Sequence, residues 1–522
     1  MSAIVTDQLR ILNAKNFIAE ITSASNNYYT FVGLTNPNEY LSTWDEDPPA
    51  PKDNFDQENH NWDTIIGLKK VDSNNVRFAL KKNTWTSGIT YDMYRHDINR
   101  DKVSQPSLAT SLYSSNFYVV NKDFKVYACL QNGTDPENPN GRPSLDEPTF
   151  IDLEPRSAGT SGDGYIWKYL FTINPNDIIK FDTLNYITVP TDWDTADEYQ
   201  SVRLNAQNSG QLKIATIKTR GVDVGSPNQV YTCDIIGDGT GGEATIVVDN
   251  QSKVDSVTIS NGGSGYTYGR IDLSTGNFPT SSTTTPTFDV IIPPKGGHGA
   301  DIYRELGCTK VLIYSQIKND ATNPDFIVGN RVARIGIIAN PEEFNSTEAL
   351  ETNQASALYA LKLTGVNAST DYINAVFDAN ATITQTISTG TTATGRVVSY
   401  NKNTGVLKYW QDRISHGFDN DLDNNDDIGI YGNDLIHFTA TPGTGGSLNI
   451  TGSNQDLQID TSFSDDKFVI NNLSYYLGQT FTNGVSNPEV KKYSGDLVYV
   501  DNRPSITRSE NQREDIKIVL QF

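Results

Sequence analysis

The chain has 522 residues, 36% of them hydrophobic, and this length is well above the roughly 250–300 residues at which one core stops growing. We therefore expect several units with buried cores, and the hydrophobic fraction is too high for a disordered chain. The formal net charge of −22 repels nucleic-acid phosphate, and no dense stripe of Lys and Arg offsets it. The composition therefore argues against nucleic-acid binding.

Cysteine usage and apolar patterning predict a protein made in a reducing cytoplasm without membrane insertion. Cys129, Cys233 and Cys308 are far apart and form no CxxC pair, which argues against a disulfide framework or a zinc site. The N-terminal segment lacks the basic and apolar regions of a signal peptide. No apolar run approaches the roughly 20 residues that a membrane span needs.

In chain order, the first segment, about residues 1–30, contains a predicted helix with apolar residues at a helical period. Residues 35–62 are rich in Asn, Asp and Pro, so we predict a loop that carries Trp44 and Trp62. Large aromatic side chains in such a loop either pin it to the body of the protein or contact a partner. The sequence leaves both interpretations open.

Short apolar runs separated by polar turns follow, and this pattern predicts an antiparallel β body. A second long loop is expected at about 131–161. The segment 162–173 then predicts a strand in which Tyr165, Trp167 and Tyr169 alternate with other side chains. We expect these three aromatic residues in the core of a layered arrangement, where the strand is buried on both faces.

Two stretches are rich in Gly, Ser, Thr and Val and poor in large side chains, and both read as inserted β modules. The second contains a hairpin signal, two alternating strands around residues 401–405. The predicted domains are a body at 1–211, 301–365 and 456–522, and modules at 212–300 and 366–455.

No catalytic or cofactor motif emerges, so an enzyme is not predicted. The five histidines form no metal-binding pair, and GDGTGG (237–242) lacks the Lys and the following helix of a phosphate-binding loop, which favours a β-turn. Asp419, Asp421 and Asp423 start like a calcium loop. However, the Gly and Glu expected later in such a loop are replaced, so structural calcium is the weaker interpretation.

Several segments, in the same order along the chain, resemble the baseplate wedge subunit encoded by gene 8 of T-even-type contractile-tailed phages. The sharpest are GDGYIWKYLF (162–171), SGDLVYVDNRPSI (494–506) and EDIKIVLQF (514–522). The two β modules fall where shorter family members have nothing comparable. Their strings NGGSGYT and ATGRVVSYNKNTGVL look similar to small β repeats in structural proteins of cyanophages.

The resemblance implies a mainly β protein with a layered antiparallel β-sandwich body and helix-bearing loops. It also implies a homodimer that sits in the virion, in the tail baseplate, beside other wedge proteins. Its role there would be structural, in tail assembly and in transmitting the contraction trigger.

Candidate contacts with partners are the loop with the two tryptophans, the loop at 131–161 and a polar excursion at 501–513 that contains Asn502 and Arg503. Arg503 either anchors a partner or pairs with a carboxylate within the fold. The alternative function is a glycan-binding tail-fibre or adhesin component, because small Gly/Tyr-rich modules can display aromatic residues to sugars. A polysaccharide-degrading enzyme rests only on the 63 acidic residues.

Overall fold

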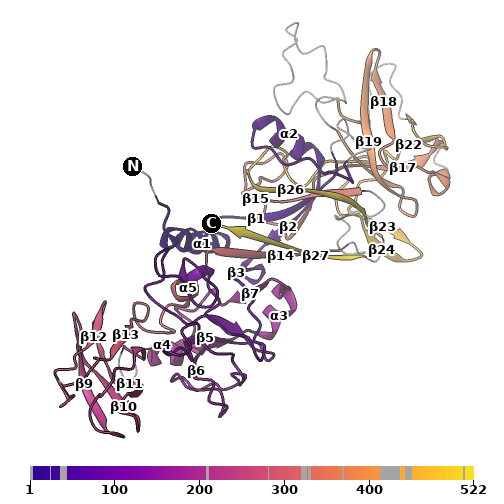
Figure 1. Ribbon diagram of the computed structural model, residues 1–522. Coiled ribbons are helices and arrows are strands. Elements are labelled where there is room, and N and C mark those ends of the chain that lie inside the picture. Colours follow the sequence, from indigo (N-terminus) through magenta and orange to yellow (C-terminus); the bar gives the residue numbers. More distant parts are fainter. Residues whose placement is uncertain are drawn as a thin grey trace. The chain divides into compact units, whose positions relative to one another are not determined.

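The computed structural model describes residues 4–23, 25–35, 44–206, 211–279, 281–318, 326, 331–366, 370–411, 436–440, 449–509 and 512–522. The fold is mainly β, with 40% strand and 12% helix, as the sequence predicts (Figure 1). The chain divides into two compact units, and the predicted body contributes residues to both. The first unit is Met1–Ile18, Arg77–Leu312 and Ile518–Phe522, and the second is Ala19–Val76 and Ile313–Lys517.

The first helix, α1 (Asp7–Thr22), confirms the helix predicted near the N-terminus. The Thr6 hydroxyl accepts a hydrogen bond from the Leu9 N–H at 3.4 Å, as a capping side chain does. Ile11, Ala14 and Ile18 recur at spacings of three and four residues, and all three are buried. The helical period in the sequence therefore marks the buried face of α1.

The first unit contains the aromatic strand inside a small antiparallel sheet. Its order is β4-β5-β6, and β5 pairs with both neighbours. A second sheet has the order β27-β14-β3-β7, in which β3 pairs with β7. Strands β14 and β27 each have residues assigned to both units. The bounds are β3 (Val76–Lys81), β4 (Tyr118–Val120), β5 (Lys125–Asn132), β6 (Tyr165–Thr172), β7 (Tyr186–Val189), β14 (Lys310–Lys318) and β27 (Arg513–Gln521), with helices α3 (Pro175–Phe181), α4 (Gln200–Asn205) and α5 (Ile302–Leu306).

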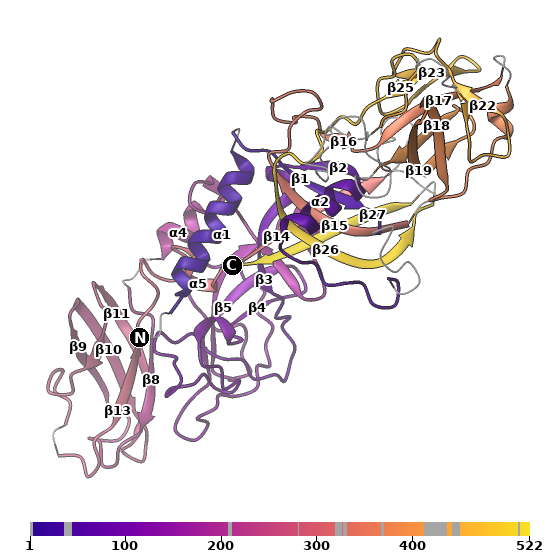
Figure 2. The same ribbon diagram turned by 90° about the horizontal axis from the view of Figure 1, so that it is seen from above.

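A small β-sandwich forms the rest of the first unit, and β8 and β11 come into contact between its two sheets (Figure 2). One sheet has the order β11-β10-β9-β12 and the other pairs β8 with β13. The predicted turn at 237–242 joins β9 to β10. The bounds are β8 (Ile214–Thr219), β9 (Val230–Gly237), β10 (Thr240–Val248), β11 (Val254–Ser264), β12 (Gly269–Ile271) and β13 (Thr287–Ile291).

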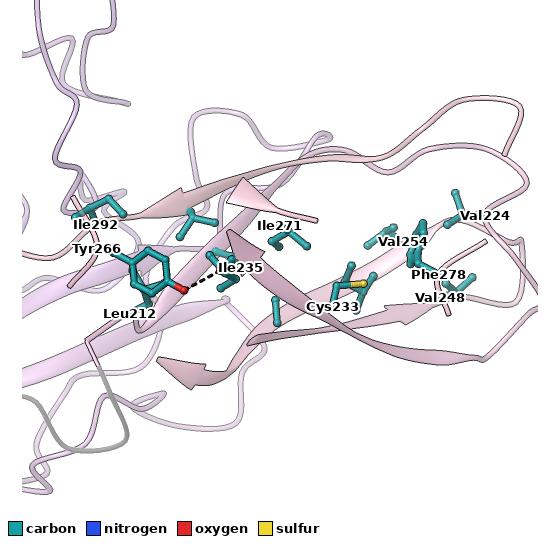
Figure 3. Packing of buried hydrophobic residues seen from close by; sticks show 14 residues of the cluster. Leu212, Val224, Cys233, Ile235, Val248, Val254, Tyr266, Ile271, Phe278 and Ile292 are labelled. Carbon is teal, nitrogen blue, oxygen red and sulfur yellow. Dashed lines mark hydrogen bonds between the residues drawn. The ribbon is translucent and has the colours of Figure 1, made fainter. Parts of the chain in front are cut away.

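This sandwich has its own hydrophobic core, which extends from Leu212 to Ile292 (Figure 3). Tyr266 lies inside it, and its hydroxyl donates to the Ile235 carbonyl at 2.7 Å and accepts from the Gly242 N–H at 3.0 Å. The core therefore uses one polar side chain to close the end of the sandwich, with its hydrogen bonds satisfied.

Asp289 of β13 lies in a partly buried ion cluster with Arg95 and Lys102. Its carboxylate is 3.0 Å from Arg95 Nη2 and 3.6 Å from Lys102 Nζ. Burial alone would raise the pKa of Asp289. The hydrogen bond from Arg95 and the charges of both cations outweigh that effect and hold the pKa below its ordinary value.

The second unit is built on a five-stranded antiparallel sheet with the order β16-β2-β1-β15-β26. Every residue of β1 is buried: Tyr29 and Phe31 enter one hydrophobic cluster, and Val32 enters another. Because neighbouring residues of a strand point to opposite faces, this sheet is covered on both faces. The bounds are β1 (Tyr28–Gly33), β2 (Ile65–Val71), β15 (Arg331–Ala339), β16 (Gln354–Ser356) and β26 (Asp496–Thr507), with helix α2 (Phe55–Thr64).

A nearly closed, barrel-like sheet also belongs to the second unit, with the order β18-β19-β20-β17-β22-β21. A bridge between Thr384 and Thr451 brings its two ends together. The bounds are β17 (Tyr359–Gly365), β18 (Thr382–Ser388), β19 (Thr391–Asn401), β20 (Val406–Trp410), β21 (Asn449–Ile450) and β22 (Leu457–Ile459), followed by β23 (Lys467–Ile470), β24 (Leu473–Tyr476) and β25 (Val485–Ser486).

The turn at 401–405 joins β19 to β20, so the predicted hairpin is confirmed. The predicted module at 366–455, however, cuts through the barrel. Strands β17 and β22 lie outside that range but contribute Leu361, Leu363 and Leu457 to the same core. Composition marked only the Thr- and Gly-rich strands, because the other barrel strands resemble those of the body.

Candidate interaction surface

Strand β26 runs through much of the predicted polar excursion, so that prediction is wrong for residues 501–507. Arg334 of β15 pairs with Asn502, and Val332 pairs with Ile506, so the three residues 503–505 oppose one residue of β15. Such a bulge on an edge strand accommodates Pro504, which has no N–H to donate. The Asn-Arg-Pro string therefore marks a bulge within the strand.

The segment 44–49, called the strap below, covers this bulge. The Trp44 indole N–H donates to the Arg503 carbonyl at 2.9 Å. The Asp45 carboxylate accepts from the Ser505 N–H at 2.9 Å and from its hydroxyl at 2.6 Å. Two side chains of the strap thus satisfy backbone groups that the bulge leaves without a strand partner.

The strap carboxylate is held in its charged form. The hydrogen bonds from the Ser505 hydroxyl and N–H are the main cause of the lowered pKa of Asp45. Arg331 Nη1 lies 3.1 Å from the same carboxylate and acts in the same direction. The contact between strap and strand is therefore charge-assisted at this position.

Arg334 fixes the inner side of the strap. Its Nε donates to Asn502 Oδ1 at 2.8 Å, its Nη1 donates to Thr64 Oγ1 at 2.5 Å, and its guanidinium lies 5.7 Å from the Trp44 ring centroid. Asn502 in turn donates from Nδ2 to the Pro49 carbonyl at 2.8 Å. Asn502, predicted as an interface residue, therefore uses both ends of its amide within the fold.

The two tryptophans predicted as contacts are internal, so the structure corrects them as interface candidates. Trp44 is 2% exposed and is pinned to β26, and Trp62 is 1% exposed. Trp62 lies in α2, where a loop was predicted, and packs in the core with Tyr29 and Leu68. The Asn54 side chain caps α2 by accepting from the Gln57 N–H at 2.8 Å. The helix was missed because its sequence, FDQENHNWDT, is almost entirely polar.

Arg503 has features of both roles that the sequence left open, a pair with a carboxylate within the fold and an anchor for a partner. Its Nε donates to Asp501 Oδ2 at 2.6 Å, yet its side chain is 59% exposed. Val498 and Ile506 are also exposed on the same strand, and so is Pro504. We call these four residues, Val498, Arg503, Pro504 and Ile506, the β26 surface. An exposed arginine with apolar neighbours is the usual composition of a protein contact.

The predicted core strand β6 places two of its three aromatics in the interior. Tyr165 and Trp167 are buried, and their rings stack at 5.3 Å with an interplanar angle of 17°. Tyr169 is only partly buried, which corrects the prediction of a core position. A bulge at Leu170 interrupts the alternation, so Leu170 and Phe171 are both buried.

The GDGY string that precedes this strand forms a corner. Gly164 has a φ of +80°, and a Cβ atom there would lie 2.8 Å from the Cα of Gly133. The Asp163 carboxylate accepts from the Tyr165 N–H at 3.0 Å and from the Leu145 N–H at 2.9 Å. The string therefore holds the long loop at 131–161 against β6. Gly164 allows the positive φ of the corner, and Asp163 supplies the hydrogen bonds to the loop and the strand.

Within the described ranges, no group of three or more His, Cys, Asp or Glu side chains is placed to hold a metal ion. The predicted calcium candidates Asp419, Asp421 and Asp423 lie outside those ranges. The three cysteines are buried free thiols. Burial raises the pKa of the Cys129 and Cys308 thiols, which disfavours the reactive thiolate.

No protein-family model matches the sequence of this chain, and a comparison with curated proteins finds no match. None of the helices in the described part of the chain is both long and apolar enough to cross a bilayer.

Proposed function

We propose that the protein is a structural subunit of the baseplate wedge of a contractile phage tail. In this role it is a homodimer that joins neighbouring wedge proteins during tail assembly and transmits the contraction trigger. The observation that carries the proposal is the ordered set of sequence segments that resemble the gene 8 wedge subunit, from the first residues to the last.

The positions of these segments in the fold support the proposal. GDGY forms the corner before β6, and DNRP (501–504) forms the strapped bulge of β26. In both strings, the combination of residue types is explained by the backbone geometry that the string adopts. Their occurrence together and in order favours a shared body architecture over a chance match of composition.

The direct test is co-expression of the full chain with the products of the genes that flank its own gene, followed by native mass spectrometry. We expect a stable complex with at least one unlike chain and two copies of this protein. If the chain stays monomeric and no flanking product binds it, the proposal fails. Binding to a glycan array by the full chain alone would instead favour the adhesin alternative.

Within this proposal, the β26 surface contacts a neighbouring chain through Arg503. Arg503→Ala should weaken assembly by tenfold or more in Kd, since an arginine at the centre of a contact contributes about 2 kcal/mol. The melting temperature should hardly change, because an exposed ion pair contributes only about 0–1 kcal/mol.

A matched control is available on β27. Arg513 is also 59% exposed and pairs with an aspartate two residues away, Asp515, at 3.4 Å. Arg513→Ala should leave assembly unchanged if the contact is specific to β26. Equal weakening by the two variants would point to a general charge effect and contradict the assignment of Arg503.

A further inference from the structure

Lys168 is a buried lysine that lies against an amide side chain. It belongs to β6, between the core residue Trp167 and the partly buried Tyr169, and it is 1% exposed. Its Nζ donates to Asn205 Oδ1 at 2.6 Å and also to the Leu153 carbonyl. Asn205 is the last residue of α4. The amine thus donates to the oxygen that is bonded to the Asn205 amide carbon.

The environment of Lys168 makes the neutral amine, which is the nucleophilic form, more accessible than it is in an exposed lysine. Burial lowers the pKa of Lys168 to about 8, and Lys213 adds to this effect. Glu154 and Glu305 act in the opposite direction but do not cancel it. A desolvated lysine of this kind has a free electron pair in a larger fraction of molecules near neutral pH than an exposed lysine has.

A carboxylate completes the group. The Asn205 Nδ2 donates to Glu154 Oε1 at 2.9 Å, so Glu154 contacts the nitrogen that would leave. The other oxygen of Glu154 lies 3.2 Å from Lys213 Nζ, which holds the carboxylate in place. The second acid near Lys168, Glu305, is already bound by the Gly299 N–H and by His298 Nδ1, each at 2.7 Å. Glu154, which contacts the Asn205 amide nitrogen, is therefore the carboxylate placed for proton transfer.

We propose that Lys168 and Asn205 form an intramolecular isopeptide bond. The Lys168 amine attacks the Asn205 amide carbon, and a new C–N bond forms. Glu154 takes a proton from the attacking nitrogen and delivers it to the amide nitrogen, and the old C–N bond breaks with release of ammonia. Atoms and charges balance, no oxidant is needed, and the hydrogen-bonded geometry supplies the proximity that such a reaction requires.

The bond would brace β6 against the end of α4, shortly before the chain enters the sandwich that begins near Leu212. It would close a span of 37 residues, and a covalent link of this length stabilises by restricting the unfolded chain, as a disulfide does. In a reducing compartment, an amide bond serves this purpose where a disulfide would not persist.

The test is mass spectrometry of the full-length protein as purified. We expect a mass lower than that of the sequence by one ammonia, about 17 Da, and a proteolytic fragment in which Lys168 and Asn205 are joined. Lys168→Arg should restore the full mass. Glu154→Gln, which keeps a hydrogen bond to Asn205, should lower the joined fraction severalfold. Lys213→Arg, a control that keeps the charge beside Glu154, should stay joined.

A succinimide at Asn205 would also release ammonia, so the joined fragment decides the matter. A wild-type protein with the full sequence mass, or with the mass loss but without the joined fragment, would overturn the proposal. Lys168 would then be a hydrogen-bonded ammonium of the interior. This outcome is independent of whether the protein binds wedge partners.

Discussion

The strap over β26 gives the sharpest prediction, because it separates a residue that stabilises the fold from one that is available to a partner. Trp44 and Arg503 are joined by a hydrogen bond from the indole to the carbonyl of Arg503. The first side chain is buried and the second is largely exposed. Replacement of each by alanine should therefore have very different effects on stability.

The magnitudes follow from the contacts. Trp44→Ala removes a buried ring that packs beside the Arg334 guanidinium, and such truncations cost about 3–5 kcal/mol. Trp44→Phe keeps most of the ring but loses the N–H donor, and should cost about 0.5–1.5 kcal/mol for the hydrogen bond. Arg503→Ala loses only an exposed ion pair, worth about 0–1 kcal/mol. The expected order is Trp44→Ala, then Trp44→Phe, then Arg503→Ala.

The assay combines urea unfolding with amide hydrogen exchange. Two compact units can unfold separately, so a global transition alone does not locate the loss. The Ser505 N–H, which donates to Asp45, reports on the strap directly. Its exchange should become faster in Trp44→Ala and stay slow in Arg503→Ala.

One result would refute this reasoning. If Trp44→Ala and Arg503→Ala destabilise by the same small amount, below about 1 kcal/mol, and Ser505 exchange is unchanged in both, the indole does not pin the strap. The loop would then regain its status as a candidate contact with a partner.

Three further predictions concern the first unit. Tyr266→Phe should cost about 1–3 kcal/mol in urea unfolding, because the Gly242 N–H loses its buried acceptor. Gly164→Ala should lower the melting temperature more than Gly162→Ala. Both glycines have a positive φ, so an alanine at either position costs about 1–2 kcal/mol in backbone strain. Only the Cβ atom at Gly164 would also meet neighbouring backbone. Equal shifts would contradict this account. Asp289→Asn should lower the urea midpoint at about pH 7, and the difference should shrink as the pH falls through the folded pKa of Asp289. That pKa is lowered, so the stabilisation is present above the ordinary carboxyl pKa and is lost below the folded value. A difference that does not decrease at all as the pH falls would contradict ion pairs as its cause.

Local patterns with a direct backbone cause were predictable from the sequence. The turn at 237–242 and the hairpin turn at 401–405 connect strands as expected, since Gly and Asn clusters between alternating runs leave few other conformations. The β character of the described residues follows for the same reason. In these segments, local preference and tertiary fold agree.

Tertiary packing decided the features that the sequence did not indicate. Trp62 is the one buried hydrophobic residue of α2, whose other residues are polar except the exposed Phe55, so α2 has no periodic apolar signal. Lys168 is buried because Asn205 and the Leu153 carbonyl, distant in sequence, supply its hydrogen bonds. The barrel limits were missed because strand pairing joins β17 to β22 across about ninety residues of chain, beyond the reach of composition.

Several residues that carry the resemblance have structural roles within the chain, and this limits what the resemblance implies about partners. Gly164, Trp167 and Asn502 are explained by backbone conformation, core packing and hydrogen bonds within the chain. A relative could share all three and bind different neighbours, because fold and contact surface are set by different side chains. The exposed residues of the β26 surface, Arg503 above all, are where partner specificity must be measured. An Arg503 variant that folds but fails to assemble would connect the inferred architecture to a contact that the architecture alone does not require.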